Sequence, residues 1–432
     1  MAGTATANDP RNVLRWFIQY LVQRKLCTLE GLRRVALFQG GLDTRIGQLA
    51  AIRGYLDARD IVRILMEQAD SDLAFGELCV RHGLMTPAQR DDLLRLQKDQ
   101  FLLFCACMEW AGTLDPDALG RIRREFLDHL AASTERPRPP SGGFPAVEAQ
   151  PRSAASVRDV LRKVREVAAL PEMVQRTLAV LDGADADLDV AARVIEADPV
   201  MATQMLRIGN SALFALRGRV TNVRKAVLML GARGTRQVVL STAAAGAFAK
   251  VGGDCGRRLW THSILAGRWA AALARARALS EPEDAAVAGI VHEFGTVVLH
   301  QYFQGEMAAV ERAQARGTSE REAELEAFGL THAEVGAFLC QQWTFPARVV
   351  ESVLHHHALP AKLRALNRLD PLAKVVNAAC RLADLDPDRF PHEWIALLGE
   401  EFVAYHGLTA DLLDQLAPDV RRQAEELTSI LG

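Results

Sequence analysis

The pair His292-Glu293 places an imidazole beside a carboxylate within the apolar run from Val287 to Gly295. Seven of the eleven histidines of the chain lie between His262 and His357. Neutral imidazole is the commonest metal ligand in proteins. An imidazole and a carboxylate that adjoin on one helix can hold one or two cations only if further ligands converge from other helices. The pattern therefore suggests a metal-binding site. Whether the site forms depends on the elements that carry the other ligands.

The tandem His355-His356-His357 has two interpretations. Two of these side chains could form a metal-binding pair. Alternatively, the tandem is the exposed end of a helix that stops before Pro360, where a cation interacts favourably with the helix dipole. We favour the second interpretation, and we read His300 as an ordinary residue of an amphipathic helix.

The elements that position these side chains are predicted to be helices. Apolar residues recur three and four positions apart, as in Val223, Val227 and Leu230, while alternating strand-like runs are scarce. A chain of 432 residues with 49% hydrophobic content is long enough for two or three domains with packed cores. We therefore expect an all-α fold.

Composition excludes several classes of protein. The formal net charge of −2 gives no chain-wide attraction to nucleic acid or to anionic lipid. The seven cysteines contain no Cys-x-x-Cys pair, so we read them as reduced thiols of a cytoplasmic protein. The sequence shows no export signal, and no uncharged apolar run approaches the length of a membrane span. We expect a cytoplasmic protein without membrane insertion.

One segment has the composition of a flexible linker. Residues 134–153 are rich in Pro, Gly, Ser and Arg and have few apolar side chains to bury. This segment divides the chain into an N-terminal helical domain, residues 11–133, and a larger helical domain, residues 154–432. The larger domain is expected to have a core at about 156–357 and a C-terminal helical extension.

The N-terminal domain contains an internal repeat with a step of 29 residues. The step relates three glutamines and three candidate helix caps: Gln39, Gln68, Gln97, Thr28, Asp57 and Thr86. Each copy is predicted to be a helix, a glycine stop, a short turn and a second helix. In the first copy Lys25 replaces the second glycine, so we expect that copy to act as a cap. Residues 101–133 are read as two packing helices broken near Gly112.

Two stretches of this domain, Arg45 to Gln68 and Phe75 to Gln97, resemble the paired motifs of the MshEN domain, a family that binds cyclic di-GMP. The resemblance implies that the ligand site is formed by Arg45, Gly47, Gly54, Gln68, Gly76, Gly83 and Gln97. Bare glycine backbone permits close approach of a ligand, and arginine offers a planar fork for phosphate or guanine. The second motif has Ala74 where its arginine is expected. Alternatively, the repeat only stacks helices and serves as a docking platform for proteins.

The larger domain resembles the HDOD domain, the HD-related output domain of bacterial signalling proteins. The resemblance is carried by these ordered blocks: Leu170-Pro171, Ile195 to Pro199, Met205 to Ser211, Val220-Thr221, Leu230-Gly231, Trp260 to Ser263, His292-Glu293, Thr331 to Gly336, and His355 to His357. HDOD domains are relatives of the HD phosphohydrolases without catalytic function. The resemblance therefore implies output through contact with a partner protein.

The HD pattern also implies a degenerate metal site. A working HD phosphohydrolase combines an upstream His, the His-Asp pair and a downstream Asp to bind cations that activate water. His262 and His292 fill two of these positions, whereas Glu293 and Cys380 replace the two aspartates. A cysteine favours softer metals or none. We expect no metal, no other cofactor and no enzymatic activity. The chain is interpreted as a non-catalytic regulator that senses cyclic di-GMP, and the alternative is a divalent-metal phosphohydrolase acting on a nucleotide or cyclic dinucleotide.

Overall fold

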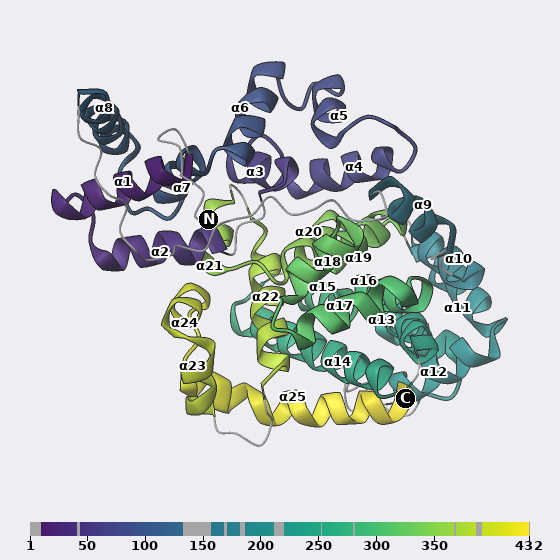
Figure 1. The fold of residues 1–432 in the computed structure, drawn as a ribbon. Coiled ribbons are helices and arrows are strands. Elements are labelled where there is room, and N and C mark those ends of the chain that lie inside the picture. The colour runs from purple at the N-terminus through teal and green to yellow at the C-terminus, as the bar shows by residue number, and fades with distance from the viewer. Residues whose placement is uncertain are drawn as a thin grey trace. The chain divides into compact units, whose positions relative to one another are not determined.

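The computed structural model describes residues 10–40, 44–132, 157–167, 171–181, 186–210, 220–251, 253–279, 281–366, 369–385 and 391–431. Every regular element in these ranges is an α-helix, so the all-α prediction is confirmed (Figure 1). The chain divides into two compact units. The first comprises residues 1–64, 73–151 and 358–368, and the second comprises residues 65–72, 152–357 and 369–432. The predicted linker, residues 134–153, lies outside the described residues.

The N-terminal part of the chain forms four units of two helices joined by a short turn, which we call hairpins. Their helices are α1 (Pro10–Gln23), α2 (Leu29–Gly40), α3 (Ile46–Ile52), α4 (Ala58–Gln68), α5 (Phe75–Arg81), α6 (Pro87–Lys98), α7 (Gln100–Trp110) and α8 (Pro116–Ala132). The short helix α21 (Pro360–Ala365) falls within the stretch 358–368 that also groups with the first unit.

The 29-residue step governs the turn of every hairpin. The second residue after the first helix takes a left-handed backbone conformation in all four copies: Lys25 (φ 55°), Gly54 (φ 72°), Gly83 (φ 68°) and Gly112 (φ 62°). Three residues later a capping side chain accepts a hydrogen bond from a backbone N–H of the next helix: Thr28, Asp57, Thr86 and Asp115. The left-handed residue satisfies the last carbonyls of one helix, and the cap satisfies the first amides of the next. Helices α7 and α8, which the sequence interpretation treated as separate packing helices, are therefore a fourth repeat.

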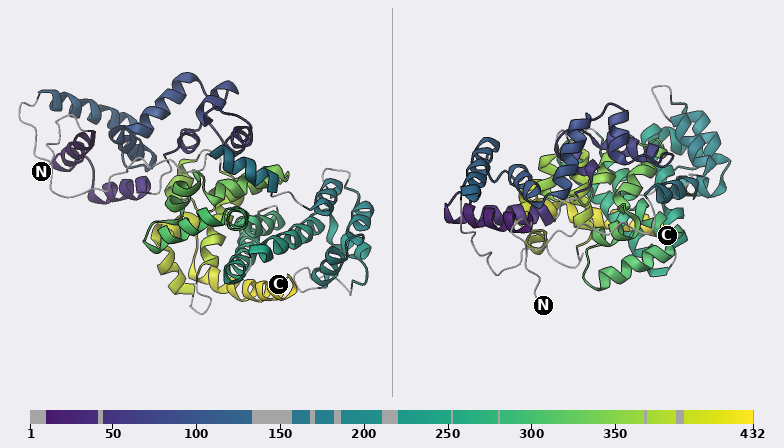
Figure 2. Two further views of the ribbon diagram at one scale, coloured as in Figure 1. Left: turned by 45° about the vertical axis from the view of Figure 1, so that its right-hand side comes forward. Right: turned by 45° about the horizontal axis from the view of Figure 1, so that its top comes forward.

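The second unit is built around the long helix α14. Its helices are α9 (Val157–Val167), α10 (Glu172–Leu181), α11 (Leu188–Glu196), α12 (Pro199–Gly209), α13 (Val223–Val251), α14 (Gly253–Ala276), α15 (Pro282–Val291), α16 (Phe294–Tyr302), α17 (Gln304–Ala315), α18 (Glu320–Phe328), α19 (His332–Gln342), α20 (Ala347–His355), α22 (Pro371–Ala383), α23 (Pro391–Leu398), α24 (Glu400–His406) and α25 (Ala410–Leu431). Helix α14 packs against α15, α22 and α25, and α10, α11 and α12 pack against α13 at one side of the unit (Figures 1 and 2).

Glycines let the helices that surround the histidines approach to backbone contact. A Cβ atom on Gly289 of α15 would lie 2.6 Å from the Cα of Gly267 on α14. A Cβ atom on Gly295 of α16 would lie 1.9 Å from the carbonyl oxygen of His332 on α19. These two crossings bring α14, the junction of α15 with α16, and the start of α19 close together. Among the described residues, no helix is both long enough and apolar enough to cross a membrane.

Candidate metal centre

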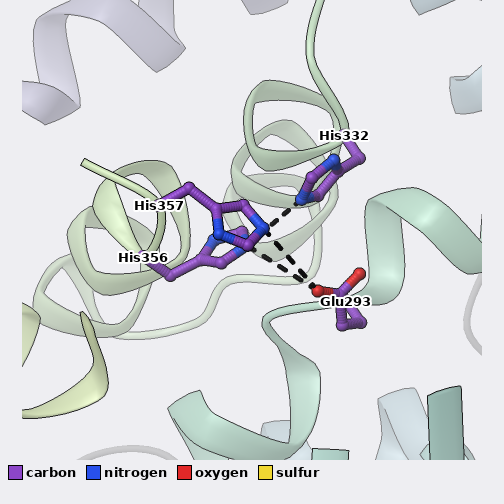
Figure 3. A group of neighbouring side chains, drawn as sticks. All are labelled: Glu293, His332, His356 and His357. Atoms are coloured by element: carbon purple, nitrogen blue, oxygen red, sulfur yellow. Dashed lines mark hydrogen bonds and ion pairs between the residues drawn. The ribbon is translucent and has the colours of Figure 1, made fainter. Parts of the chain in front are cut away.

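Four side chains from three places in the second unit converge on one point. Glu293, His332, His356 and His357 each offer a ligand atom, and these atoms lie within 4.8 Å of one another. Glu293 stands at the junction of α15 and α16, His332 is the first residue of α19, and the two other histidines follow α20 (Figure 3). We call this group the Glu293 cluster. It offers three nitrogen atoms and one carboxylate oxygen, a ligand set that suits divalent transition metals.

A second group lies beside the first. His262 on α14, His292 at the end of α15 and Cys380 on α22 also offer ligand atoms within 4.8 Å of one another. The Nε2 atom of His262 lies 3.0 Å from Nε2 of His292 and 3.9 Å from Sγ of Cys380. We call this group the Cys380 cluster. The structure thus brings together the sequence-predicted residues of the HD pattern.

The local chain explains how two of these groups are presented. The sequence interpretation put His292 and Glu293 on one helix, but α15 ends at Val291 and α16 begins at Phe294. The pair therefore occupies a junction, where two successive side chains can serve two different clusters. Thr331 caps α19 by accepting a hydrogen bond from the backbone N–H of Glu334, which holds His332 in the first turn.

The hydrogen bonds that the Nδ1 atoms donate orient the imidazoles toward the clusters. Nδ1 of His292 donates to the carbonyl oxygen of Gly289 at 2.7 Å, and Nδ1 of His356 donates to the carbonyl of Val353 at 2.6 Å. A carbonyl oxygen only accepts, so Nδ1 carries the proton in both rings and a neutral ring has its lone pair on Nε2. Carboxylates hold the other two rings: Asp384 lies 3.1 Å from Nδ1 of His262, and Glu324 lies 2.8 Å from Nδ1 of His332.

The Nε2 atoms consequently face each other in two pairs. His262 and His292 are separated by 3.0 Å, and His332 and His356 are separated by 3.2 Å. Two lone pairs at this separation repel, so each pair requires a proton or a metal cation between the rings. The same four histidines can therefore form two hydrogen-bonded imidazolium–imidazole pairs or can contribute Nε2 ligands to two metal ions.

The surroundings of the four imidazoles shift their pKa values in opposite directions within each pair. Burial lowers the pKa of His332, but the carboxylates of Glu324 and Glu293 outweigh burial and raise this pKa to about 10. Burial likewise lowers the pKa of His262, and the hydrogen bond to Asp384 leads the effects that raise it above its ordinary value. Burial lowers the pKa of His292 to about 4, so this ring stays neutral. Burial also holds the pKa of His356 well below its ordinary range, so His332 and His262 are the rings that bind a proton more readily in each pair.

Glu293 lies between the clusters. Its Oε1 atom is 3.5 Å from Nε2 of His292, 3.9 Å from Nε2 of His356 and 4.0 Å from Nε2 of His357. The hydroxyl of Thr296 donates to Oε2 at 2.5 Å. Burial raises the pKa of the Glu293 carboxyl, but the neighbouring histidines hold it well below its ordinary range, so the group is a carboxylate. A carboxylate in this position can contact ions in both clusters.

The spacing fits bound metal ions. Zinc binds nitrogen, oxygen and sulfur at about 2.0–2.3 Å in tetrahedral geometry, so two ligand atoms on one ion lie roughly 3.3–3.8 Å apart. The facing Nε2 atoms, at 3.0 and 3.2 Å, and the Nε2 of His262 with the Sγ of Cys380, at 3.9 Å, lie near this spacing. His262, His292 and Cys380 would hold one ion, and Glu293, His332, His356 and His357 would hold the other.

The sequence interpretation of the histidine tandem was wrong in one respect. It placed His355 to His357 at an exposed helix end, whereas His355 is 2% exposed and His356 is fully buried. Only His357, with a side chain 39% exposed, opens toward solvent. His332 was not predicted as a ligand, and a metal-binding pair within the tandem was the less favoured of its two interpretations. Their blocks were noted in the sequence, but no local pattern indicates that they meet Glu293.

The glycines of the predicted nucleotide site have structural roles in the hairpins. Gly54 and Gly83 are the left-handed residues in the turns that follow α3 and α5. A Cβ atom on Gly47 would lie 3.0 Å from the ring of Phe75, and one on Gly76 would lie 2.7 Å from a methyl group of Ile46. The two motifs therefore pack closely against each other through α3 and α5.

The polar residues of that predicted site lie at helix ends. Arg45 occupies the N-cap position of α3 in an extended backbone conformation, and Ala74 occupies the same position before α5. Gln97 lies in the last turn of α6. Gln68 ends α4 and belongs to the stretch 65–72 that groups with the second unit.

Comparison with known proteins identifies the larger part of the second unit. Residues 167–359 match the HDOD domain family. An uncharacterized protein of Treponema pallidum is 25% identical over 242 residues, which are 55% of this chain and 47% of that protein, so the chain spans about half the length of this relative.

One solved structure supports the similarity in fold, and a second is reported beside it. A protein of Shewanella amazonensis described as a "putative phosphohydrolase" is 25% identical, with a TM-score of 0.53 and coverage of 63% of this chain and 98% of that chain. An HDOD domain protein with unknown function from Geobacter sulfurreducens is 21% identical, with a TM-score of 0.48 and coverage of 62% and 97%.

Proposed function

We propose that this chain, in which residues 167–359 form an HDOD domain, is a bacterial signal-transduction protein whose HDOD module binds divalent transition-metal ions and acts on a partner protein by contact. One observation carries the metal assignment: seven potential ligands gather in two adjacent clusters whose imidazole Nε2 atoms face each other in pairs at 3.0 and 3.2 Å. Bound cations would take the place of the proton in each pair. This proposal revises the expectation of no metal that we drew from the sequence.

Burial and ligand type favour contact output over hydrolysis. His292, His356 and Cys380 are fully buried, which restricts the approach of a phosphate ester. Hydrolysis of phosphate esters relies on metal ions that polarise phosphate and activate water. A thiol in place of a carboxylate shifts one cluster toward softer ions. A buried centre of this kind ties α14, α15, α19, α20 and α22 together and can stabilise one arrangement of the domain over another.

The metal content of the purified full-length chain tests this proposal. After incubation with zinc or manganese and removal of free ions, we expect one to two ions per chain in the wild type and a loss of at least half in His356→Ala. His392, exposed on α23, provides the matched control, because His392→Ala removes an imidazole outside both clusters. A wild-type content below about a tenth of an ion per chain would refute metal binding.

A second candidate function is metal-dependent phosphohydrolysis. It is favoured by the position of Glu293 between the clusters and by the partial exposure of His357, because two ions that share a carboxylate can clamp a phosphate. The metal-loaded chain is incubated with a chromogenic phosphodiester and with cyclic di-GMP. Turnover that disappears in His356→Ala and persists in His392→Ala would establish this function and would overturn output by contact alone.

We also propose that the N-terminal hairpins sense cyclic di-GMP through the residues of the two motifs, with Arg45 as the principal phosphate or guanine ligand. The reciprocal packing of α3 against α5, in which Gly47 faces Phe75 and Gly76 faces Ile46, supports a two-fold ligand, because it places the two motifs side by side. Binding to one arrangement of the chain would bias the output module by population shift.

Calorimetric titration with cyclic di-GMP tests the sensor proposal. We expect heat of binding in the wild type, its loss in Arg45→Ala and its retention in Arg63→Ala, which removes an exposed arginine of α4 that pairs with Asp60. The absence of heat in the wild type at ligand concentrations of tens of micromolar would leave the hairpins as a protein-docking platform.

A further inference from the structure

We infer that the Cys380 cluster is a thiolate-ligated subsite that selects zinc-like ions, whereas the Glu293 cluster accepts harder ions, so that the centre is chemically asymmetric. This inference rests on the proposed metal binding and assigns a different ion class to each half of the centre. It concerns side chains of this chain that differ from the HD pattern, in which a carboxylate occupies the place of Cys380.

The ligand set of the Cys380 cluster is that of a three-ligand zinc site. Two imidazole nitrogens and one sulfur, from His262, His292 and Cys380, lie within 4.8 Å of one another. Cys380 is fully buried on α22 and lies 3.9 Å from Nε2 of His262. Zinc is held by three protein ligands of these types when its fourth position stays open. Glu293, whose Oε1 is 3.5 Å from Nε2 of His292, can approach that fourth position.

The surroundings orient both imidazoles toward the sulfur. Asp384, the C-cap residue one turn after Cys380, holds Nδ1 of His262, and the carbonyl of Gly289 holds Nδ1 of His292. Such partners fix the tautomer and the orientation of metal-binding imidazoles. Helix α22 therefore supplies the sulfur, and its C-cap residue, four positions later, supplies the carboxylate that aims a second ligand at the same point.

The other cysteines of the chain show that this placement is specific. Cys79, Cys105, Cys107 and Cys340 are buried, and none belongs to a group of potential metal ligands among the described residues. Cys255 lies 3.8 Å from Nε2 of His300, but no third ligand joins this half-buried pair within the described part of the chain. Among the described residues, the other buried cysteines therefore lack the pair of imidazole ligands that accompanies Cys380.

The two clusters differ in the hardness of their donors. The Glu293 cluster has no sulfur and offers three imidazoles with one carboxylate. Soft thiolate ligands favour zinc and similar ions, whereas carboxylate ligands suit manganese and iron(II) as well. A thiol that coordinates a divalent ion gives up its proton to solvent, and the resulting thiolate forms the metal–sulfur bond. The Cys380 cluster gains a negative charge in this way only when an ion is bound.

Cobalt(II) provides a direct probe, because a thiolate ligand adds an intense sulfur-to-cobalt charge-transfer band in the near ultraviolet. We expect titration of the metal-free full-length chain with cobalt(II) to develop this band. Cys380→Ser should remove the band and weaken zinc binding more than about tenfold, by analogy with the loss that follows removal of groups supporting a metal site. Manganese binding should change less than about threefold, because its ligands lie in the Glu293 cluster.

Two further variants distinguish a failure of the thiolate subsite from a failure of the proposed metal binding. Cys340→Ser is the matched control, since Cys340 is also fully buried but lies on α19 outside both clusters, and it should retain the band. Cys380→Asp should bind cobalt(II) without the band. Cobalt(II) binding without the band in the wild type, or a band that survives in Cys380→Ser, would overturn the thiolate subsite alone. No binding of cobalt(II), zinc or manganese would overturn the metal-binding function itself.

Discussion

The substitution Gly295→Ala should separate the two helices that bring Glu293 to His332. The added Cβ atom would lie 1.9 Å from the carbonyl oxygen of His332 and 2.8 Å from the backbone nitrogen of Gly336, whereas ordinary contact begins at 3.4 Å. Helices α16 and α19 would therefore have to move apart by about 1.5 Å, because packed backbone has no free volume to absorb the methyl group. Overpacking of a core costs about 1–3 kcal/mol, and contact with rigid backbone puts this position near 3 kcal/mol.

The same displacement should disable the Glu293 cluster. Metal ligands must sit within about 0.2 Å of their ideal distances, so a shift of His332 by about 1.5 Å removes it from the shared ion. Two measurements check the prediction: the free energy of unfolding in denaturant, and the number of manganese ions retained per chain. Both should fall in Gly295→Ala.

Gly305→Ala is the control for this experiment. Gly305 lies in α17, and no heavy atom stands within 4 Å of the Cβ that alanine would add. Alanine should stabilise this helix by about 0.5–1 kcal/mol and leave metal retention unchanged. If Gly295→Ala unfolds at the same denaturant concentration as the wild type, or if it retains its full metal content, then the α16–α19 crossing does not position the centre as we have argued.

Three other substitutions probe separate parts of the molecule. Lys25→Gly should stabilise the first hairpin by about 1 kcal/mol in thermal or denaturant unfolding. Lys25 has a left-handed conformation (φ 55°), and the other three repeats have glycine at this position. A destabilised variant would contradict the repeat geometry. Asn377→Ala should lower the free energy of unfolding by about 2 kcal/mol. The Asn377 amide donates to two carbonyl oxygens at the end of α20 and accepts from a buried imidazole of α24. An unchanged free energy of unfolding would show that these groups find other partners. In the metal-free protein the raised pKa of His332 contributes stability that is complete below about pH 6.5 and is lost as pH rises through about 10. Glu324→Gln should flatten this alkaline loss in unfolding measured across that range, and an unchanged pH profile would exclude the ion pair as its source.

In the repeat domain, some features could be predicted from sequence patterns and one could not. The turns could be predicted because glycine and the capping residues act on their own backbone, and their 29-residue step is visible in the sequence. The fourth hairpin was missed although Gly112 and Asp115 continue the same step. Most of α7 is buried. A helix that is apolar on all sides lacks the amphipathic pattern by which a repeat helix can be recognised in the sequence, so α7 did not stand out as a copy.

The sequence by itself determined the helical architecture, the hairpin turns and the positions of His262, His292, Glu293 and Cys380 in a family pattern, because each depends on local conformation or on ordered motifs. Only the tertiary structure decided that His332, His356 and His357 join Glu293. Their meeting depends on the close crossing of α16 with α19 and on the burial of the end of α20. These are contacts between segments distant in the chain, and no local spacing encodes them. The direction in which each imidazole presents its lone pair was likewise settled by carbonyl and carboxylate groups that packing brings to its Nδ1 atom.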